Sequence, residues 1–228
     1  SGRGKRGAGV KAACSRVMAV ADPTAPLPLD GLLAGGRPLE IEIGCGNGRF
    51  LVARAQKQPD TLFMGIERML SRVRKLDKKA CRLGLDNIRV LRLEAFYTFY
   101  YLLPPHRARA VYVFFPDPWP KRHHHTRRLF SPLFLDALWF RLETGGAIQI
   151  ATDHQEYFAD TLKSFASDPR FREMPAMERD ASEQTDFEML FRRQSLPIWQ
   201  CAFEALPHAE KPLPPLCIAE SDEPRERP

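Results

Sequence analysis

The sequence predicts an α/β fold: a doubly wound sheet that is mostly parallel, with an antiparallel closing strand. Three observations predict it. Short apolar runs alternate along the chain with segments of helical spacing. The first apolar run ends in a glycine-rich turn, as a buried strand that leads into a helix does. The 228 residues, 44% of them hydrophobic, suffice for one full-sized core and are too few for two large domains.

The elements follow from apolar runs and from the residues that stop them. Gly84 closes one helix, Pro116 stops a strong apolar strand, and Gly145-Gly146 end a further helix. We expect parallel strands at residues 39–43, 62–66, 88–93, 110–115 and 147–151. We expect helices at residues 49–57, 70–83, 128–142 and 157–165. Two later runs, residues 187–191 and 198–203, are predicted to be a closing pair of strands.

The ends of the chain differ in composition from its middle. Residues 1–37 are predicted to be a flexible basic arm that continues into a connector stiffened by Pro23, Pro26 and Pro28. Residues 38–206 form the main domain. Residues 207–228 are predicted to be a Pro-rich, charged tail.

Charge and cysteine usage limit the classes of protein. The net charge of +6 favours a polyanionic partner. The five cysteines include no Cys-x-x-Cys pair, so we expect neither a disulfide framework nor a thiolate zinc site, and we expect a cytoplasmic location. No apolar run is long enough to span a bilayer, so no membrane partner is expected.

The first strand leads into a turn typical of nucleotide-like ligands. Glu42 precedes Gly44-Cys45-Gly46-Asn47-Gly48, and the second strand ends at Glu67, where a carboxylate can accept hydrogen bonds from ribose hydroxyls. A carboxylate before the glycines would repel a pyrophosphate, but it suits the cationic methionine end of S-adenosylmethionine. Glu94, after the third strand, could reach an adenine edge or simply cap a helix N-terminus. A tight turn with solvated acids is the structural alternative for the whole group.

The loop after the fourth strand carries a second set of candidates. Three prolines hold Asp117 and Trp119 at the strand tip, as a purine pocket needs: the ring stacks and the carboxylate accepts hydrogen bonds. The following basic run, residues 121–128, could contact phosphates. Alternatively, Trp119 covers the core, the basic run is a solvated surface, or the triple histidine at 123–125 binds a metal. We expect no metal, because consecutive residues rarely converge on one ion.

These motifs together resemble the tRNA (guanine-N7-)-methyltransferase family. The segments are Glu-Ile-Gly-Cys-Gly-Asn-Gly, Gly-Ile-Glu, Phe-Pro-Asp-Pro-Trp-Pro-Lys, Ala-Thr-Asp and Thr-Asp-Phe-Glu, in order over about residues 38–205. The Pro-Asp-Pro-Trp loop is the most specific of them. The resemblance implies a Rossmann-like methyltransferase domain, S-adenosylmethionine as methyl donor, and a guanine of the tRNA variable loop as acceptor.

The resemblance also implies roles for individual residues. Around the cofactor it places Glu42, Gly44, Gly46, Glu67, Glu94, Thr185 and Glu188. On the side of the tRNA and guanine it places Asp117, Trp119, Lys121, His124, Arg127 and Asp153, of which Asp117, His124 and Arg127 are the expected catalytic residues. Asp153 could instead open a capping box with Glu156, and Thr185 and Glu188 could be strand-surface residues.

The chain departs from the family pattern at a few positions. Glu94 replaces the usual Asp, His123 and Thr126 replace basic residues, Leu190 replaces a basic residue, and Ser195 replaces a glycine. Loss of cationic groups weakens the expected binding of tRNA and leaves the reasoning about the cofactor site unchanged. These losses motivate one alternative, a catalytically weak RNA-binding protein of the same fold.

Guanine N7 carries a lone pair and no proton, so methyl transfer needs positioning and charge placement rather than a general base.

Two alternative functions remain besides the weak RNA-binding protein. One is a methyltransferase of another base, since the loop loosely resembles the Asp-Pro-Pro-aromatic loop of amino-methylating enzymes. The other is a nicotinamide dehydrogenase, disfavoured by the glycine spacing and Glu42. We expect a monomer that binds tRNA; a β-propeller partner subunit, used by some relatives, is the alternative.

Overall fold

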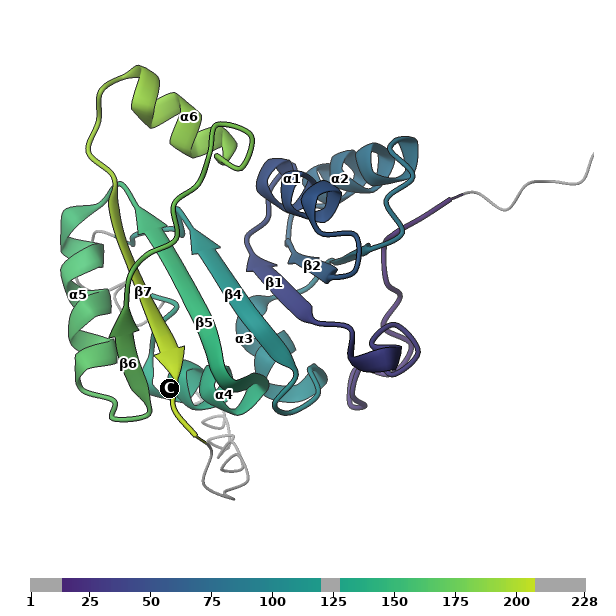
Figure 1. The fold of residues 1–228 in the computed structure, drawn as a ribbon, viewed down its shortest axis with the longest axis horizontal. Coiled ribbons are helices and arrows are strands. Elements are labelled where there is room, and N and C mark those ends of the chain that lie inside the picture. The colour runs from purple at the N-terminus through teal and green to yellow at the C-terminus, as the bar shows by residue number, and fades with distance from the viewer. Residues whose placement is uncertain (1–13, 120–127, 208–228) are drawn as a thin grey trace, which may run out of the picture.

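A computed structural model of the chain describes residues 14–119 and 128–207. Its centre is a seven-stranded sheet in the order β3-β2-β1-β4-β5-β7-β6 (Figure 1). The strands are β1 (Leu39–Ile43), β2 (Leu62–Ile66), β3 (Ile88–Leu91), β4 (Ala108–Phe114), β5 (Leu142–Thr152), β6 (Phe171–Met174) and β7 (Trp199–Ala205). The helices are η1 (Ala34–Gly36), α1 (Arg49–Lys57), α2 (Leu70–Arg82), α3 (Ala95–Tyr97), η2 (Thr98–Leu102), α4 (Pro132–Arg141), α5 (Gln155–Ala166) and α6 (Asp186–Arg193).

The pairing confirms the predicted fold class. Strands β3, β2, β1, β4 and β5 run parallel to one another, and β7 pairs antiparallel with both β5 and β6. The order of the strands reverses beside β1, between β1 and β4, which is where ligands bind in open sheets of this kind.

Helices cover both faces of the sheet. Apolar side chains of α1 and α2 pack on β2 and β3, and these two helices lie side by side in Figure 1. A larger cluster joins the opposite face to α4 and α5 through Phe134, Leu138, Tyr157 and Phe165. Burial on both faces explains why the strands read as continuous apolar runs rather than as alternating ones.

Two element predictions were wrong. Residues 187–191 are not a strand but part of α6, and the closing antiparallel pair consists of β6 and β7. The helix expected from residue 128 begins at Pro132, because the Ser131 side chain caps it by accepting a hydrogen bond from the Phe134 N–H at 3.3 Å. That helix ends at Arg141, and β5 then begins at Leu142, before the two glycines that were expected to end the helix.

The segment before β1 is not a loose connector over its described part. The side chains of Leu27, Leu29 and Leu33 are buried in the main core, and Val17 forms a parallel bridge with Val90 at the outer edge of β3. Residues 14–37, expected to belong to a flexible arm and connector, therefore pack against the domain. The more strongly basic start of the arm and the tail after residue 207 lie outside the described residues.

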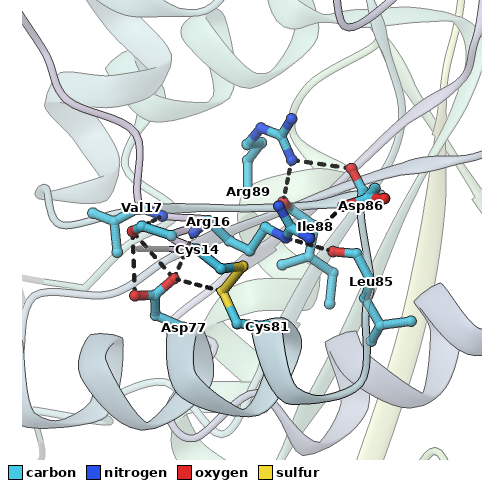
Figure 2. Close-up of a disulfide and its surroundings, with 10 residues drawn as sticks. Cys14, Arg16, Val17, Asp77, Cys81, Leu85, Asp86, Ile88 and Arg89 are labelled. Atoms are coloured by element: carbon cyan, nitrogen blue, oxygen red, sulfur yellow. Dashed lines mark hydrogen bonds and ion pairs between the residues drawn. A yellow bond between two sulfur atoms is a disulfide. The ribbon is translucent and has the colours of Figure 1, made fainter. Parts of the chain in front are cut away.

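A disulfide joins this segment to α2, contrary to the expectation from cysteine spacing. Cys14 is bonded to Cys81, which lies 67 positions further along the chain (Figure 2). Among the described cysteines, Cys45 and Cys201 are free and buried.

Every helix within residues 14–119 and 128–207 falls short of the length and apolarity that crossing a membrane requires.

Candidate active site

The carboxyl ends of β1, β2, β3 and β4 border one cleft of about 610 Å³. Its walls bring together Gly44, Glu67, Glu94, Asp117 and Trp119, which lie up to 75 positions apart in the sequence. The residues predicted from the motifs thus converge at the edge of the sheet where parallel strands end.

A smaller hollow of about 110 Å³ adjoins this cleft and shares Gly44, Arg72, Phe114 and Phe187 with it. Its further lining includes Glu42, Gly46 and Thr185. Of the predicted cofactor residues, all except Glu188 therefore line one or both of two adjoining spaces.

The glycine turn needs glycine for its backbone conformation. Gly44, Gly46 and Gly48 have φ values of +71°, +54° and +71°, in the left-handed region that other residues rarely adopt. A Cβ on Gly44 would meet nothing within 4 Å, whereas one on Gly48 would lie 2.2 Å from the Leu76 side chain. The first glycine leaves open space for a ligand, and Gly48 allows α1 to pack against α2.

Glu42 is a buried carboxylate without a full set of partners. Its side chain is 3% exposed, and its Oε2 has no hydrogen-bond partner among the described residues. Burial raises the pKa of the Glu42 carboxyl well above its ordinary value, and the nearby Glu67 carboxylate adds to the rise. An unpaired buried acceptor is costly, so the hollow beside Glu42 suits a cationic or hydrogen-bond-donating group.

Glu67 has a different environment from Glu42. Its Oε2 accepts a hydrogen bond from the Gly46 N–H at 3.0 Å, and its Oε1 accepts one from the Met69 N–H at 2.8 Å. The Arg72 guanidinium lies 3.8 Å from Oε2. Each carboxylate oxygen has a second lone pair, so Glu67 ties the glycine turn to β2 and can still accept hydroxyl donors from a ligand.

Glu94 caps the short helix α3, as one of the two interpretations expected. Its Oε2 accepts a hydrogen bond from the Tyr97 N–H at 2.8 Å. The side chain is exposed and lines the large cleft. The capping hydrogen bond therefore holds the Glu94 carboxylate on the wall of the cleft.

The loop after β4 holds its conformation under strain. Phe115 and Trp119 have φ values of +54° and +44°, which cost roughly 1–2 kcal/mol for residues with a side chain. The Phe115 N–H donates to the Ala151 carbonyl at 2.7 Å. Asp117 is exposed and Trp119 is half-buried, and both line the large cleft.

Arg128 anchors this loop instead of offering its charge to phosphates. Its side chain is 8% exposed; it donates to the Pro118 carbonyl at 3.0 Å and forms ion pairs with Glu156 and Asp160. Its guanidinium also lies over the Tyr157 ring. The prediction that the whole basic run faces RNA is therefore wrong for Arg128. The other members of that run, including Lys121, His124 and Arg127, lie outside the described residues.

Helix α6 brings Thr185 to the glycine turn. The Thr185 Oγ1 caps the helix by accepting a hydrogen bond from the Glu188 N–H at 3.0 Å, and Thr185 lines the smaller hollow. Glu188 is fully buried and forms ion pairs with Arg179 at 3.0 Å and Arg192 at 2.9 Å. It does not line either space, so the structure places Thr185 at the site and Glu188 in the scaffold that holds it.

Several residues to which the sequence analysis gave no role also reach the site. Asp186 and Asn47 both line the smaller hollow and are joined by a hydrogen bond of 3.3 Å. The Arg49 side chain donates to the Gln184 carbonyl at 3.0 Å. Phe187 contributes to both spaces. Correct assignment of α6 as a helix would have indicated Asp186, because it is the first residue after the cap.

Asp153 is exposed and belongs to neither space. It does not open a capping box either: α5 is capped by His154, whose Nδ1 accepts a hydrogen bond from the Tyr157 N–H at 3.3 Å. Within the described parts of the chain, no group of three or more His, Cys, Asp or Glu side chains could hold a metal ion. The triple histidine lies outside those parts.

Comparison with known proteins identifies relatives along most of the domain. A family model described as "Putative methyltransferase" matches residues 36–201. A tRNA (guanine-N(7)-)-methyltransferase of Halorhodospira halophila is 39% identical over 145 residues, which cover 64% of this chain and 63% of that relative. One of Methylococcus capsulatus is 35% identical over 191 residues, which cover 80% of this chain and 81% of that relative.

Solved structures agree on the fold. The antibiotic-resistance methyltransferase Kmr has a TM-score of 0.56 and 20% identity, covering 79% of this chain and 92% of that one. At this identity the likeness supports the Rossmann-like methyltransferase fold and no particular substrate.

Proposed function

This chain belongs to the tRNA (guanine-N7-)-methyltransferase family, and we propose that it transfers a methyl group from S-adenosylmethionine to N7 of a guanine in the variable loop of tRNA. The observation that carries the proposal is that one cleft is lined by Glu67 and Glu94 as well as by Asp117 and Trp119. It supports a cofactor half and a base-recognition half at the same end of the sheet.

The residues of the first half fit the donor molecule. The unpaired Oε2 of Glu42 suits a cationic amino group, the open space beside Gly44 and Gly46 admits a ligand against the backbone, and Glu67 suits ribose hydroxyls. Glu94 is proposed for the adenine edge. S-adenosylmethionine, when bound, supplies an electrophilic methyl group on a sulfonium. Thr185 would contribute through the smaller hollow, and Glu188 by holding α6 in place.

The second half orients the base. Trp119 offers a ring on which a purine can stack, and Asp117 offers a carboxylate beside it. The base becomes cationic as N7 gains the methyl group, so a nearby carboxylate favours the transition state more than the neutral ground state. No side chain has to remove a proton from N7. Lys121, His124, Arg127 and Asp153 are proposed for the tRNA on the strength of the family resemblance.

The test is a transfer assay with labelled S-adenosylmethionine and unmodified total tRNA, followed by digestion and identification of the labelled nucleoside. Label in 7-methylguanosine is expected. Asp117→Ala should lose at least 100-fold in rate, on the order of 3 kcal/mol of transition-state stabilisation, while its affinity for S-adenosylhomocysteine stays within twofold. Label in another nucleoside would favour the alternative base methyltransferase. Binding of both ligands without label would favour the weak binder, and an active Asp117→Ala variant would remove Asp117 from its role.

Two further assignments belong to this proposal. A reaction on tRNA is consistent with work in the cytoplasm, and a single domain with its site on one chain is consistent with a monomer. Light scattering after size-exclusion chromatography, with and without tRNA, measures the oligomeric state.

A further inference from the structure

The outer face of α2 carries an unusually one-sided charge. The buried side of this helix consists of Val73, Leu76 and Ala80, which pack on the sheet. The opposite side consists of four exposed cations: Arg74, Lys75, Lys78 and Arg82. At 3.6 residues per turn, Arg74, Lys78 and Arg82 lie in one row at spacings of i and i+4.

This arrangement costs the helix free energy. Like charges at i and i+4 destabilise a helix by about 0.2–0.5 kcal/mol per pair, and Arg74–Lys78, Lys78–Arg82 and Lys75–Lys79 are three such pairs. Surface helices usually interleave acids to avoid this cost. Within α2 the only acid is Asp77.

Asp77 does not neutralise the row, because the N-terminal segment uses it. Its carboxylate accepts hydrogen bonds from the Ser15 hydroxyl and the Arg16 N–H, beside the Cys14–Cys81 disulfide (Figure 2). In residues 14–119 and 128–207, no carboxylate forms an ion pair with any of the four exposed cations. The outer face of α2 therefore carries a net positive charge that the single carboxylate of Asp77 offsets only in small part.

Cations also line the cleft near the start of α2. Arg72, in the first turn of α2, and Arg68, just before the helix, line the cleft itself. The Arg92 Nε donates to the Arg68 carbonyl at 3.4 Å. At the other end of α2, the disulfide joins Cys14 to Cys81. A polyanion that enters the cleft would meet cations along the length of the helix, about 20 Å for 13 residues.

We propose that the outer face of α2, through Arg74, Lys78 and Arg82, is a docking surface for the sugar-phosphate backbone of the RNA whose guanine enters the cleft. The inference rests on the proposed function and adds the surface that holds the body of the substrate. An acidic membrane is the less suitable partner, because the apolar side of α2 is buried on the sheet and cannot enter a lipid layer.

The test compares two triple variants of equal charge change. One is Arg74→Gln/Lys78→Gln/Arg82→Gln. The matched control is Arg107→Gln/Lys163→Gln/Arg172→Gln, three exposed cations on the loop before β4, on α5 and on β6. Glutamine is a good helix former, and the α2 variant also removes like-charge pairs, so it is expected to fold.

The readout is the slope of log affinity for tRNA against log salt concentration. Each lost phosphate contact reduces the slope by about 0.7–0.9, so the α2 variant should lose about 2–3 in slope and bind roughly 10- to 100-fold more weakly at 0.15 M salt. Its KM for tRNA should rise, with kcat at saturating tRNA and affinity for S-adenosylhomocysteine within twofold of wild type. The control variant should keep most of the wild-type slope.

Equal slopes in the two variants would overturn the docking surface, as would an α2 variant that loses binding to phosphatidylserine vesicles but not to tRNA. Failure of the proposed function has a different signature, because it appears in the wild-type protein as label absent from 7-methylguanosine. A wild type that labels 7-methylguanosine, together with equal slopes, would reject only the docking surface.

Discussion

Glu42→Gln is expected to weaken the binding of S-adenosylhomocysteine while leaving the ligand-free protein at least as stable as wild type. The Glu42 Oε2 is buried and has no hydrogen-bond partner among the described residues. The Leu51 N–H and the Arg179 charge offset only part of the cost of burying this carboxylate, and a cationic ligand would offset more of it. Hydrogen bonds to charged groups contribute about 1.5–3 kcal/mol. Their loss corresponds to roughly 10- to 150-fold weaker binding, measurable by calorimetric titration with this non-reacting product.

The same reasoning predicts how the stability of the ligand-free protein and its affinity for a cationic ligand change with pH. The folded-state pKa of Glu42 lies well above its ordinary value of 4.5, so the unfolded chain loses this proton first. The free energy of unfolding of the ligand-free wild type therefore falls as pH rises from about 4.5 through the folded pKa. Binding of a cation needs the carboxylate, so affinity should rise over the same interval, by up to tenfold per pH unit. Glu42→Gln should lack both dependences.

Glu67→Gln is the matched control for Glu42→Gln. Both oxygens of Glu67 accept backbone N–H groups, and the amide nitrogen of glutamine cannot accept one. This variant should lose about 1–2 kcal/mol in the ligand-free state, whereas Glu42→Gln should gain about 1 kcal/mol, or about 2–4 °C in Tm. A Glu42→Gln protein that is less stable without ligand and binds S-adenosylhomocysteine as wild type does would refute the reasoning.

Two further predictions concern stability away from the cleft. Ser195 follows α6 with a φ of +54°, and the Leu196 N–H donates to the Phe191 carbonyl, a helix ending that favours glycine. Ser195→Gly should therefore raise the free energy of unfolding, measured in urea, by about 0.5–1 kcal/mol. Ser195→Ala should not raise it, because alanine also has a Cβ. Cys14→Ser should lower the free energy of unfolding by at most about 4 kcal/mol, because the substitution opens a loop of 67 positions. Dithiothreitol should lower the free energy of unfolding of the wild type by the same amount and leave that of Cys14→Ser unchanged. A Cys14→Ser protein that dithiothreitol still destabilises would contradict the disulfide's role.

Local patterns were sufficient for the first two strands and for the turn between them. The strands at 39–43 and 62–66 and the helix at 49–57 are predicted within their observed bounds, since apolar runs and glycines act within a few residues. The error at α6 had a local signal that was overlooked. Thr185-x-x-Glu188 has the form of a capping box, and the structure confirms that Thr185 caps a helix.

Other features depend on partners that are distant in sequence. Nothing near Arg128 shows that Glu156 and Asp160 would bury it, so it was interpreted as one more phosphate contact. Likewise the pairing of Cys14 with Cys81 depends on where the N-terminal segment crosses β3. Spacing within a sequence cannot supply such information, because it is set by the folded topology.

Helix α6 contacts both halves of the proposed site. Phe187 lines both the large cleft and the smaller hollow, and the Phe115 ring, in the strained loop, lies 6.5 Å from that of Phe187 and 5.3 Å from that of Phe191. The strain at Phe115 and Trp119 persists only if surrounding contacts fix the loop. Arg128 does so from one side and α6 from the other. Because α6 is capped at Thr185 beside the glycine turn, a ligand that orders the turn would also stiffen the loop that carries Asp117.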